Sequence, residues 1–444
     1  MVVVAGCAAL FLAGGAQAQD WPQWRGASRD GKAAGFTAPK TWPKELPEKW
    51  KTTVGEGVAT PALVGDKLYV FARQDGNEIT RCLDAATGRE VWQDKYESLG
   101  ATAPAQNFSG PRSSPTVVDG KVVTLGVRGM ISCLDAATGK PLWRKDEFKA
   151  YPRFFPSSSP VVVNGLCIAQ LGGQDNGALV AYDLATGEQK WKWAGDTPGY
   201  ASPMLMKVGG AQLIIAETER RLVAVNAADG KLAWETPYAV QGRGYNASTP
   251  IVNGETLIFC GSGRGTRAVK FEKTAEGFSG KELWSNTDKS VQFNTPVVKD
   301  GLLYGLSAGN EFFCLNVTDG KIAWTAPLGK GEEAQPGPSP GGTTAAAGGG
   351  TGGGGPGGGP GGRGSGRGMG GMGGGGYGSI VDAGSVLLAL TPAAELVAFE
   401  PGDKAYTEVA RIKVADGQTY AYPVVSGSRI FVKDRDSVTL RTIE

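Results

Sequence analysis

Short apolar runs separated by turn residues fill most of the chain. Residues 116–118 and 122–125 are two such runs, with Asp119-Gly120 between them. An Asp-Gly or Asn-Gly pair between apolar runs is a strong β-hairpin signal. The pattern therefore predicts short antiparallel strands joined by tight turns. A Ser-Pro or Thr-Pro marker opens most units, at Thr60-Pro61, Ser114-Pro115, Ser159-Pro160, Ser202-Pro203, Thr249-Pro250 and Thr295-Pro296.

A second element, D-x-x-T-G-x-x-x-W, follows the hairpins. The segment that starts at Asp84 ends at Trp92, and two close copies and three weaker ones follow at intervals of 40–51 residues. The Asp side chain can bond the N–H groups of its own turn, and Gly supplies a positive φ. We expect the indole rings to fill the wedge between neighbouring sheets, with each ring N–H bonded to a partner. The tryptophans in this register are Trp50, Trp92, Trp143, Trp191, Trp234, Trp284 and Trp324.

These two elements predict the architecture. Four short strands at a period of 40–50 residues are typical of a β-propeller blade. Trp50 has no preceding strands of its own, whereas the C-terminal strands after Tyr422 have no tryptophan strand after them. The sequence therefore predicts an all-β, eight-bladed propeller of four-stranded antiparallel blades over residues 50–444. Its N- and C-terminal strands close the ring within one shared blade.

The repeats resemble the pyrroloquinoline quinone (PQQ)-type propeller repeat over nearly all of the chain after Trp50. That repeat occurs in quinoprotein dehydrogenases and in a non-enzymatic group, which includes the lipoprotein of the outer-membrane β-barrel assembly machinery. The leader sequence DWPQWRG, from Asp20 to Gly26, is similar to the start of exported PQQ-repeat proteins of planctomycete-like bacteria. The resemblance implies the fold, and it does not by itself imply the cofactor.

The N-terminus predicts export. Residues 2–16 are small and apolar, and an A-x-A pattern ends at Ala18, as in a secretory signal peptide. We expect a signal peptide at residues 1–18, a leader at 19–49 that packs on the propeller, and a location in the periplasm or cell envelope. Lipoprotein processing at Cys7 is the alternative. The other five cysteines form no C-x-x-C pair, so we expect buried thiols, with one disulfide left open.

One tract departs from the strand pattern. Glycine accounts for 25 of the residues at positions 337–378, between the sixth and seventh predicted blades. This composition cannot bury apolar surface, so we expect a disordered insertion there. Arg363 and Arg367 lie in an Arg-Gly context, but 45 Lys and Arg against 43 Asp and Glu predict no nucleic-acid partner.

The composition excludes several kinds of catalysis. The chain has no His, which removes the Ser/His/Asp triad, the Cys/His pair and the HExxH zinc site. We therefore expect no catalytic residue, no metal and no cofactor. The alternative implied by the resemblance is a dehydrogenase with PQQ and Ca²⁺ over the channel. That family carries two adjacent Cys beside the quinone, and this chain has no Cys-Cys pair.

The loops before the markers are the candidate binding site. An aromatic residue recurs there with Arg or Asn beside it, and Tyr and Arg are enriched in binding hot spots. Such loops meet at the channel mouth of a propeller; the alternative is that the rings only fill this mouth. The expected face comprises Phe108, Arg112, Arg153, Phe155, Tyr200, Arg243, Tyr245, Asn246, Phe293, Asn294 and Tyr420.

These observations predict an exported, monomeric, non-catalytic platform. Its partner would be another envelope protein or a peptide, bound through the loops between blades. No segment after the signal peptide is long and apolar enough to span a membrane. Two alternatives stay open: the PQQ-dependent dehydrogenase, and a factor in outer-membrane protein assembly.

Overall fold

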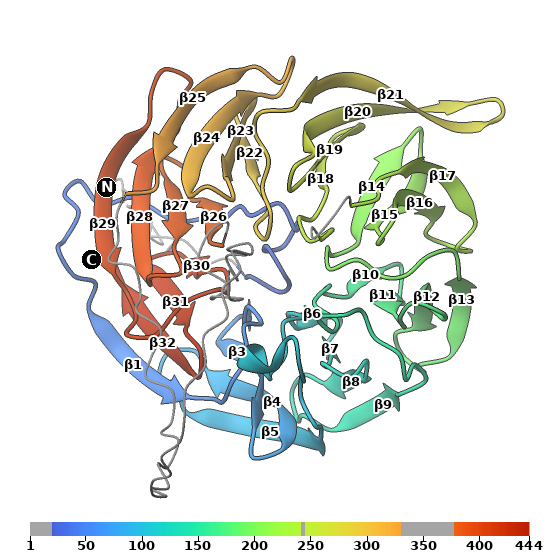
Figure 1. Cartoon of the computed structure of the whole chain (residues 1–444). Helices are drawn as coiled ribbons and strands as arrows, with labels where there is room; N and C mark the ends of the chain where they lie inside the picture. The colour runs from blue at the N-terminus through green and yellow to red at the C-terminus, as the bar shows by residue number, and fades with distance from the viewer. Residues whose placement is uncertain (1–19, 241–244, 330–376, 444) are drawn as a thin grey trace, which may run out of the picture.

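The computed structural model describes residues 20–240, 245–329 and 377–443. Their 32 strands form eight four-stranded antiparallel sheets arranged in a ring (Figure 1). The predicted eight-bladed propeller is therefore confirmed. A 3-10 helix at Gln106–Phe108 lies in the connection between the first two blades. Residues 1–19, 241–244 and 330–376 lie outside the described part, and with them the expected signal peptide, Cys7, Arg243 and nearly all of the Gly-rich tract.

In the first seven blades the strands follow one another along the chain from the innermost to the outermost. Blades 1 to 3 comprise β2 (Ala62–Val64), β3 (Lys67–Gln74), β4 (Asn77–Asp84), β5 (Glu90–Glu97); β6 (Thr116–Val118), β7 (Lys121–Leu125), β8 (Ile131–Asp135), β9 (Pro141–Lys145); and β10 (Val161–Val163), β11 (Leu166–Leu171), β12 (Ala178–Asp183), β13 (Gln189–Trp193). Blades 4 to 6 comprise β14 (Met204–Val208), β15 (Ala211–Glu217), β16 (Arg221–Asn226), β17 (Leu232–Pro237); β18 (Ile251–Asn253), β19 (Thr256–Gly261), β20 (Gly265–Thr274), β21 (Gly277–Asn286); and β22 (Val297–Lys299), β23 (Leu302–Leu306), β24 (Glu311–Asn316), β25 (Ile322–Pro327). Blade 7 comprises β26 (Ser379–Asp382), β27 (Leu387–Leu390), β28 (Glu395–Glu400) and β29 (Thr407–Lys413).

The two ends of the chain share blade 8. Its strands are β30 (Val424–Ser426), β31 (Arg429–Lys433), β32 (Ser437–Thr442) and, outermost, β1 (Glu48–Thr53). Antiparallel pairing sets Trp50 opposite Leu440 and Thr53 opposite Ser437. The ammonium of Lys433, which is 1% exposed, holds the loop after β1 through the carbonyls of residues 55 and 57 and also bonds those of residues 434 and 435, at 2.9–3.2 Å.

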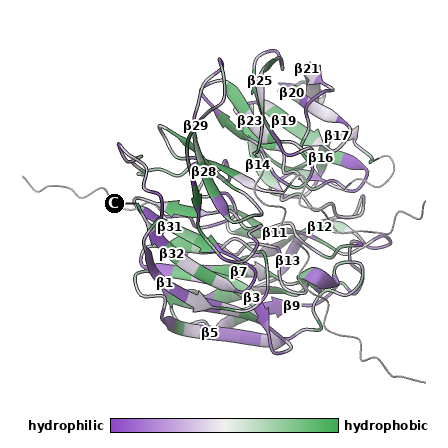
Figure 2. Cartoon of the chain, turned by 60° about the vertical axis from the view of Figure 1, so that its left-hand side comes forward, coloured by the Kyte–Doolittle hydropathy of each residue, from purple (hydrophilic) through white to green (hydrophobic). Residues whose placement is uncertain are grey.

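The apolar core lies between neighbouring blades. Strands in the middle of each blade are buried on both faces, as in β3, whereas the outer strand β5 alternates exposed and half-buried positions. Figure 2 shows the same contrast between the hydrophobic strands β28 and β19 and the hydrophilic outer strands β5 and β9. A β-bulge interrupts the pairing of the outermost strand in each of the eight blades. Bulged outer strands are poor templates for pairing with another chain.

The repeat tryptophans join each blade to the next. Trp50 Nε1 in blade 8 donates to the carbonyl of Ala85 in blade 1, at 3.2 Å. Trp234 makes a different contact and packs edge-to-face on Phe271, with 4.7 Å between ring centroids. The indole bond recurs in five further pairs, Trp92–Ala136, Trp143–Leu184, Trp191–Ala227, Trp284–Val317 and Trp324–Gly402.

The D-x-x-T-G turn receives the indole of the preceding blade. Asp84 Oδ1 accepts bonds from the N–H and the hydroxyl of Thr87, at 2.9 and 2.7 Å, and these bonds lower the pKa of Asp84. In the next repeat Gly139 has a φ of 74°, and a Cβ added to it would lie 2.4 Å from the ring of Trp92. Gly139 is therefore required both for its left-handed backbone and for the close approach of the indole. The other pairs are Gly88–Trp50, Gly187–Trp143, Gly230–Trp191 and Gly320–Trp284.

The Ser/Thr-Pro markers form a hydrogen-bonded ring at the start of the innermost strands. The N–H of Thr60 donates to Ser114 Oγ in the next blade, at 3.1 Å. In blade 8, Tyr422 stands in the marker position and donates its N–H to Thr60 Oγ1, at 2.9 Å. The marker hydroxyls thus satisfy backbone donors that have no neighbouring strand. The series continues through Ser114–Ser159, Ser159–Ser202, Ser202–Thr249 and Thr249–Thr295.

Replacing Gly139 by Ala is expected to lower the free energy of unfolding by about 2–4 kcal/mol. A non-glycine residue at positive φ costs about 1–2 kcal/mol, and overpacking against the indole adds about 1–3 kcal/mol. Gly120 is the matched control, because it has a φ of 69° and no atom within 4 Å of an added Cβ. Denaturant unfolding should show a smaller loss for Gly120→Ala. Equal losses would contradict the docking of the indole on the glycine.

Candidate functional site

The two faces of the propeller differ. Each innermost strand starts on one face, which we call the loop face and which carries the markers, and ends at a tight turn on the other, which we call the turn face. In blade 1 the strand β2 lies between Thr60 on the loop face and Gly65 on the turn face. The D-x-x-T-G turns also lie on the turn face, since the N–H of Ala85 bonds the carbonyl of Asp66 at 2.8 Å. The loops that carry the expected binding residues lie on the loop face.

The leader enters the channel from the turn face. Asp20 Oδ1 accepts the N–H of Gly65 at 2.7 Å, and Trp21 pairs with β2. The chain then reaches the level of the markers, turns, and returns along β26, where the N–H of Ala33 bonds the carbonyl of Asp382 at 2.8 Å. In Figure 1 the blue leader accordingly reaches the middle of the ring. The channel is therefore occupied by the chain's own N-terminal segment.

Arg25 closes the gap in the marker ring between blades 6 and 8. Its Nη1 donates to the carbonyl of Thr295 at 2.8 Å and to Tyr422 Oη at 3.0 Å, and its Nη2 donates to the carbonyl of Pro296 at 2.8 Å. The guanidinium lies 5.6 Å from the ring centroids of both Trp24 and Tyr422, within cation–π range. Only 1% of Arg25 is exposed, so the carbonyls replace water as its partners.

Arg29 makes the corresponding contacts on the opposite side of the channel. Its two Nη atoms donate to the carbonyls of Ser159 and Pro160 in blade 3, both at 3.0 Å. Burial, and then the nearby charge of Arg25, lower the pKa of Arg29 to about 9, so it stays a cation at neutral pH. Both arginines have left-handed backbones, with φ of 61° and 57°. Such strain persists only where surrounding bonds hold it, as the carbonyl contacts of both guanidiniums do.

Aromatic rings gather on the loop face in two clusters. The first is a row of Phe108, Tyr420, Tyr377 and Phe293, from the loops before blades 2, 8, 7 and 6. Successive centroids in this row lie 5.2, 5.1 and 4.4 Å apart. Tyr377 and Phe293 stack with only 15° between their planes. Sequence reasoning missed Tyr377, because it lies inside the Gly-rich interval; its position just before β26 was the signal that could have found it.

The second cluster comes from the loops before blades 3, 4 and 5. Phe154 lies 4.8 Å from Tyr245 and 6.2 Å from Tyr200, and the two tyrosines lie 5.9 Å apart. Tyr200 Oη accepts the N–H of Phe154 at 3.2 Å. All seven rings are half-buried, so each keeps part of its surface open to a partner. We call the set Phe108, Phe154, Tyr200, Tyr245, Phe293, Tyr377 and Tyr420 the aromatic rosette.

Three of the expected face residues are buried instead. Asn246 is 2% exposed, and its amide nitrogen donates to the carbonyls of residues 218, 219 and 238. Asn294 donates to the carbonyl of Leu306 at 2.7 Å. Phe155 packs under the loops, stacked on Tyr151. These side chains hold the loops in place, whereas Arg153 is exposed beside Phe154.

Arg112 lies between the two clusters. Its Nη2 donates to the carbonyl of Phe108 at 2.7 Å, and burial lowers its pKa to about 10. The charge of Arg112 acts on Tyr377 in the first cluster and on Tyr200 in the second. Burial raises the pKa of both tyrosines to about 12, so their hydroxyls stay neutral donors.

The described residues do not fit PQQ with Ca²⁺. Arg25 and Arg29 fill the axis at the level of the markers, and no three His, Cys, Asp or Glu of the described chain come together as a metal site. The deeply buried Glu217 has two carboxylate oxygens without a described partner, and burial raises its pKa well above the usual value. Its charged neighbour is Arg264 rather than further oxygen ligands. The five described cysteines are buried free thiols.

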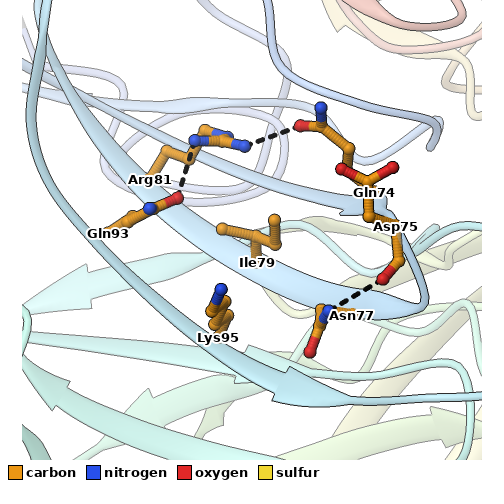
Figure 3. Close-up of a pocket in the computed structure, with 7 residues that line it drawn as sticks. All are labelled: Gln74, Asp75, Asn77, Ile79, Arg81, Gln93 and Lys95. Carbon is orange, nitrogen blue, oxygen red and sulfur yellow. Dashed lines mark hydrogen bonds between the residues drawn. The ribbon is translucent and has the colours of Figure 1, made fainter.

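A polar pocket on the flank of blade 1 lies apart from the rosette (Figure 3). Its main cation, Arg81, already bonds Gln74 and Gln93 at 2.7 and 2.8 Å. Small-molecule sites are mostly apolar, whereas this lining is mainly polar. We therefore place the candidate site at the rosette rather than at this pocket.

A family model described as outer membrane protein assembly factor BamB matches residues 75–326, which is more than half of the chain. The chain belongs to this family of PQQ-repeat propellers. The protein of that name from Burkholderia pseudomallei is 27% identical over 297 residues, 63% of this chain and 69% of the relative. Within the described residues, no helix has the length and apolar character of a membrane span.

Similarity to quinoprotein dehydrogenases is more local. Quinohemoprotein alcohol dehydrogenase ADH-IIG of Pseudomonas putida is 28% identical over 192 residues, which is 42% of this chain but 26% of the relative. BamB from Moraxella catarrhalis superposes with a TM-score of 0.60 at 14% identity, over 90% of this chain and all of that one. The Comamonas testosteroni quinohemoprotein alcohol dehydrogenase gives 0.61 at 14%, over 95% of this chain and 80% of that one. At such identity the superpositions show the fold alone.

Replacing Arg25 by Met is expected to destabilise the fold by about 2–4 kcal/mol, because three acceptors at the channel axis lose a charged donor. The stability of Arg25→Lys should lie between those of the wild type and Arg25→Met, because Lys keeps the positive charge but lacks the two-pronged guanidinium group. Arg89, exposed on the turn face, supplies the control Arg89→Met with little effect expected. Denaturant unfolding measures all three variants. Unchanged stability of Arg25→Met would show that the leader does not help to close the ring.

Proposed function

We propose that this chain is an exported, non-catalytic binding platform that holds a segment of another envelope protein on its aromatic rosette. The observation that carries the proposal is the rosette itself, seven half-buried rings from seven different loops. Rigid aromatic side chains offer large contact area at a low cost in side-chain entropy. Together with Arg they are the residue types that dominate binding hot spots.

The position of the leader supports the same function. Asp20, the first described residue, lies on the turn face, where its Oδ1 accepts the N–H of Gly65. The described end of the leader is therefore on the face opposite the loops that would hold the partner, and the proposal includes export through the segment that ends at Ala18 or lipidation at Cys7. A monomeric platform in the periplasm or cell envelope is the finer form of this proposal.

The relatives named outer membrane protein assembly factor BamB favour one class of partner. We extend the proposal to a partner within the machinery that assembles outer-membrane proteins. The rosette would hold that partner by side-chain packing, because the bulged outer strands are poorly suited to strand addition. No catalytic step is part of this function.

A photo-crosslinking amino acid at position 245 or 420 is expected to give the same adduct in envelope extracts. The two positions belong to different clusters of the rosette and would contact one partner. Lys140 is exposed on the turn face and is the matched control, where that adduct should not form. Adducts of different mass at the two rosette positions, or the same adduct at position 140, would argue against a loop-face platform.

Titration with PQQ and Ca²⁺ is expected to show no saturable micromolar binding. The reason is that Arg25 and Arg29 fill the axis and the described residues offer no cluster of oxygen ligands. Dye reduction with alcohols or sugars should stay at background, with a quinohemoprotein alcohol dehydrogenase as the positive control. Saturable binding together with substrate-dependent dye reduction would establish the dehydrogenase alternative.

A further inference from the structure

Arg112 lies beside the rosette and makes no ion pair with an acidic residue of the described chain. Its Nη2 is bonded to the carbonyls of Phe108 and Ala105, at 2.7 and 3.4 Å. Its Nη1 is shielded from solvent and has no hydrogen-bond partner among the described residues. An N–H donor of a charged group that is removed from water without an acceptor is costly. One of the two terminal nitrogens of the guanidinium therefore has no hydrogen-bond acceptor among the described residues.

The acidic group that acts on Arg112 is already hydrogen-bonded elsewhere. Glu78 is the acid whose charge acts on Arg112. Its Oε2 accepts the hydroxyl of Tyr96, and its Oε1 accepts Ser98 Oγ and the N–H of Val127, at 3.2 and 2.9 Å. Glu78 joins blade 1 to the start of the β7–β8 turn and does not reach the fork. A second acid, Glu56, lies on the loop between β1 and β2, and its carboxylate pairs with Arg435 at 3.2 Å.

The surroundings of Arg112 suit one kind of ligand. The charge of Arg112 acts on both Tyr377 and Tyr200. Tyr200 Oη accepts the N–H of Phe154 and keeps its own proton as a donor. The rings of Phe108 and Tyr420 form an apolar wall beside it, with centroids 5.2 Å apart. A carboxylate can accept hydrogen bonds from the unbonded end of the guanidinium and from a tyrosine hydroxyl. An aromatic or aliphatic residue next to that carboxylate can pack on the rings of Phe108 and Tyr420.

We propose that Arg112 receives a carboxylate of the bound partner, next to an aromatic or aliphatic residue that packs in the rosette. This inference rests on the proposed function and names the chemistry that the platform recognises. The carboxylate is either an acidic side chain or the end of a chain.

Three small probes test the inference. N-acetylphenylalanine carries a chain-end carboxylate beside an aromatic ring, and N-acetylphenylalaninamide is the same molecule without the charge. N-acetyl-aspartyl-phenylalaninamide supplies a side-chain carboxylate instead. Affinities are measured by ¹⁹F NMR on protein labelled with fluorotyrosine, so that the tyrosines of the rosette report binding. We expect at least one acid probe to bind about tenfold or more tightly than the amide, and the stronger acid identifies the source of the carboxylate.

Arg112→Gln should abolish that preference for the acid. Arg112→Lys keeps the charge without the fork, and its preference should be reduced, which gives a second test if the Gln variant does not fold. Arg435→Gln, on the same face and paired with Glu56, is the control that should keep the full preference. Equal binding of acids and amide by the wild type would overturn the inference while leaving an aromatic platform. The inference would also be overturned if no probe bound, or if the preference for the acid were unchanged in both Arg112 variants. The crosslinking experiment tests separately whether the loop face is a binding platform at all.

Discussion

The contact between an indole and the glycine of the next blade is the constraint on which this ring depends. It fixes the distance between neighbouring sheets, because Gly139 leaves no room for a Cβ beside Trp92. It also fixes how each sheet is oriented relative to the next, because the indole N–H has its acceptor in the following blade. Repeated around the ring, this contact builds a core between sheets rather than within them. The contact differs in three places: Trp234 packs on Phe271 of blade 5, Trp324 bonds the carbonyl of Gly402 in blade 7 without packing on that glycine, and β29 of blade 7 has no tryptophan to offer blade 8.

Closure of the ring determines where binding can occur. The terminal strands β1 and β32 pair within blade 8, and the leader returns through the channel to supply Arg25 and Arg29 at the level of the markers. The axis is thus occupied by the chain itself, and the turn face carries the start of the described chain. The loop face keeps half-buried aromatic rings and Arg112. The same closure that stabilises the fold is thus one reason to propose the loop face as the binding face.

The sequence predicted the fold in detail and the site in part. Tryptophan spacing and marker positions were enough for the blade count and the closing strand, because most repeats share the same local chemistry. The role of the marker hydroxyls and of Arg25 could not be predicted, since the hydroxyls bond the marker of the adjacent blade and Arg25 bonds residues about 270 positions further along the chain. Asn246 and Asn294 look like surface residues in the sequence, yet their amides bond backbone carbonyls. Only the folded loops distinguish such supports from the rings that remain open.

Hydrogen–deuterium exchange of the chain with and without its crosslinked partner tests the central claim most directly. The account predicts slower exchange in the loop-face segments 146–160, 194–203, 287–296 and 414–423. Exchange in the turns that follow Asp84, Asp135 and Asp183 on the opposite face should stay unchanged. Protection confined to the outer strands or to the turn face, with the loops unaffected, would contradict a platform that binds through its aromatic rosette.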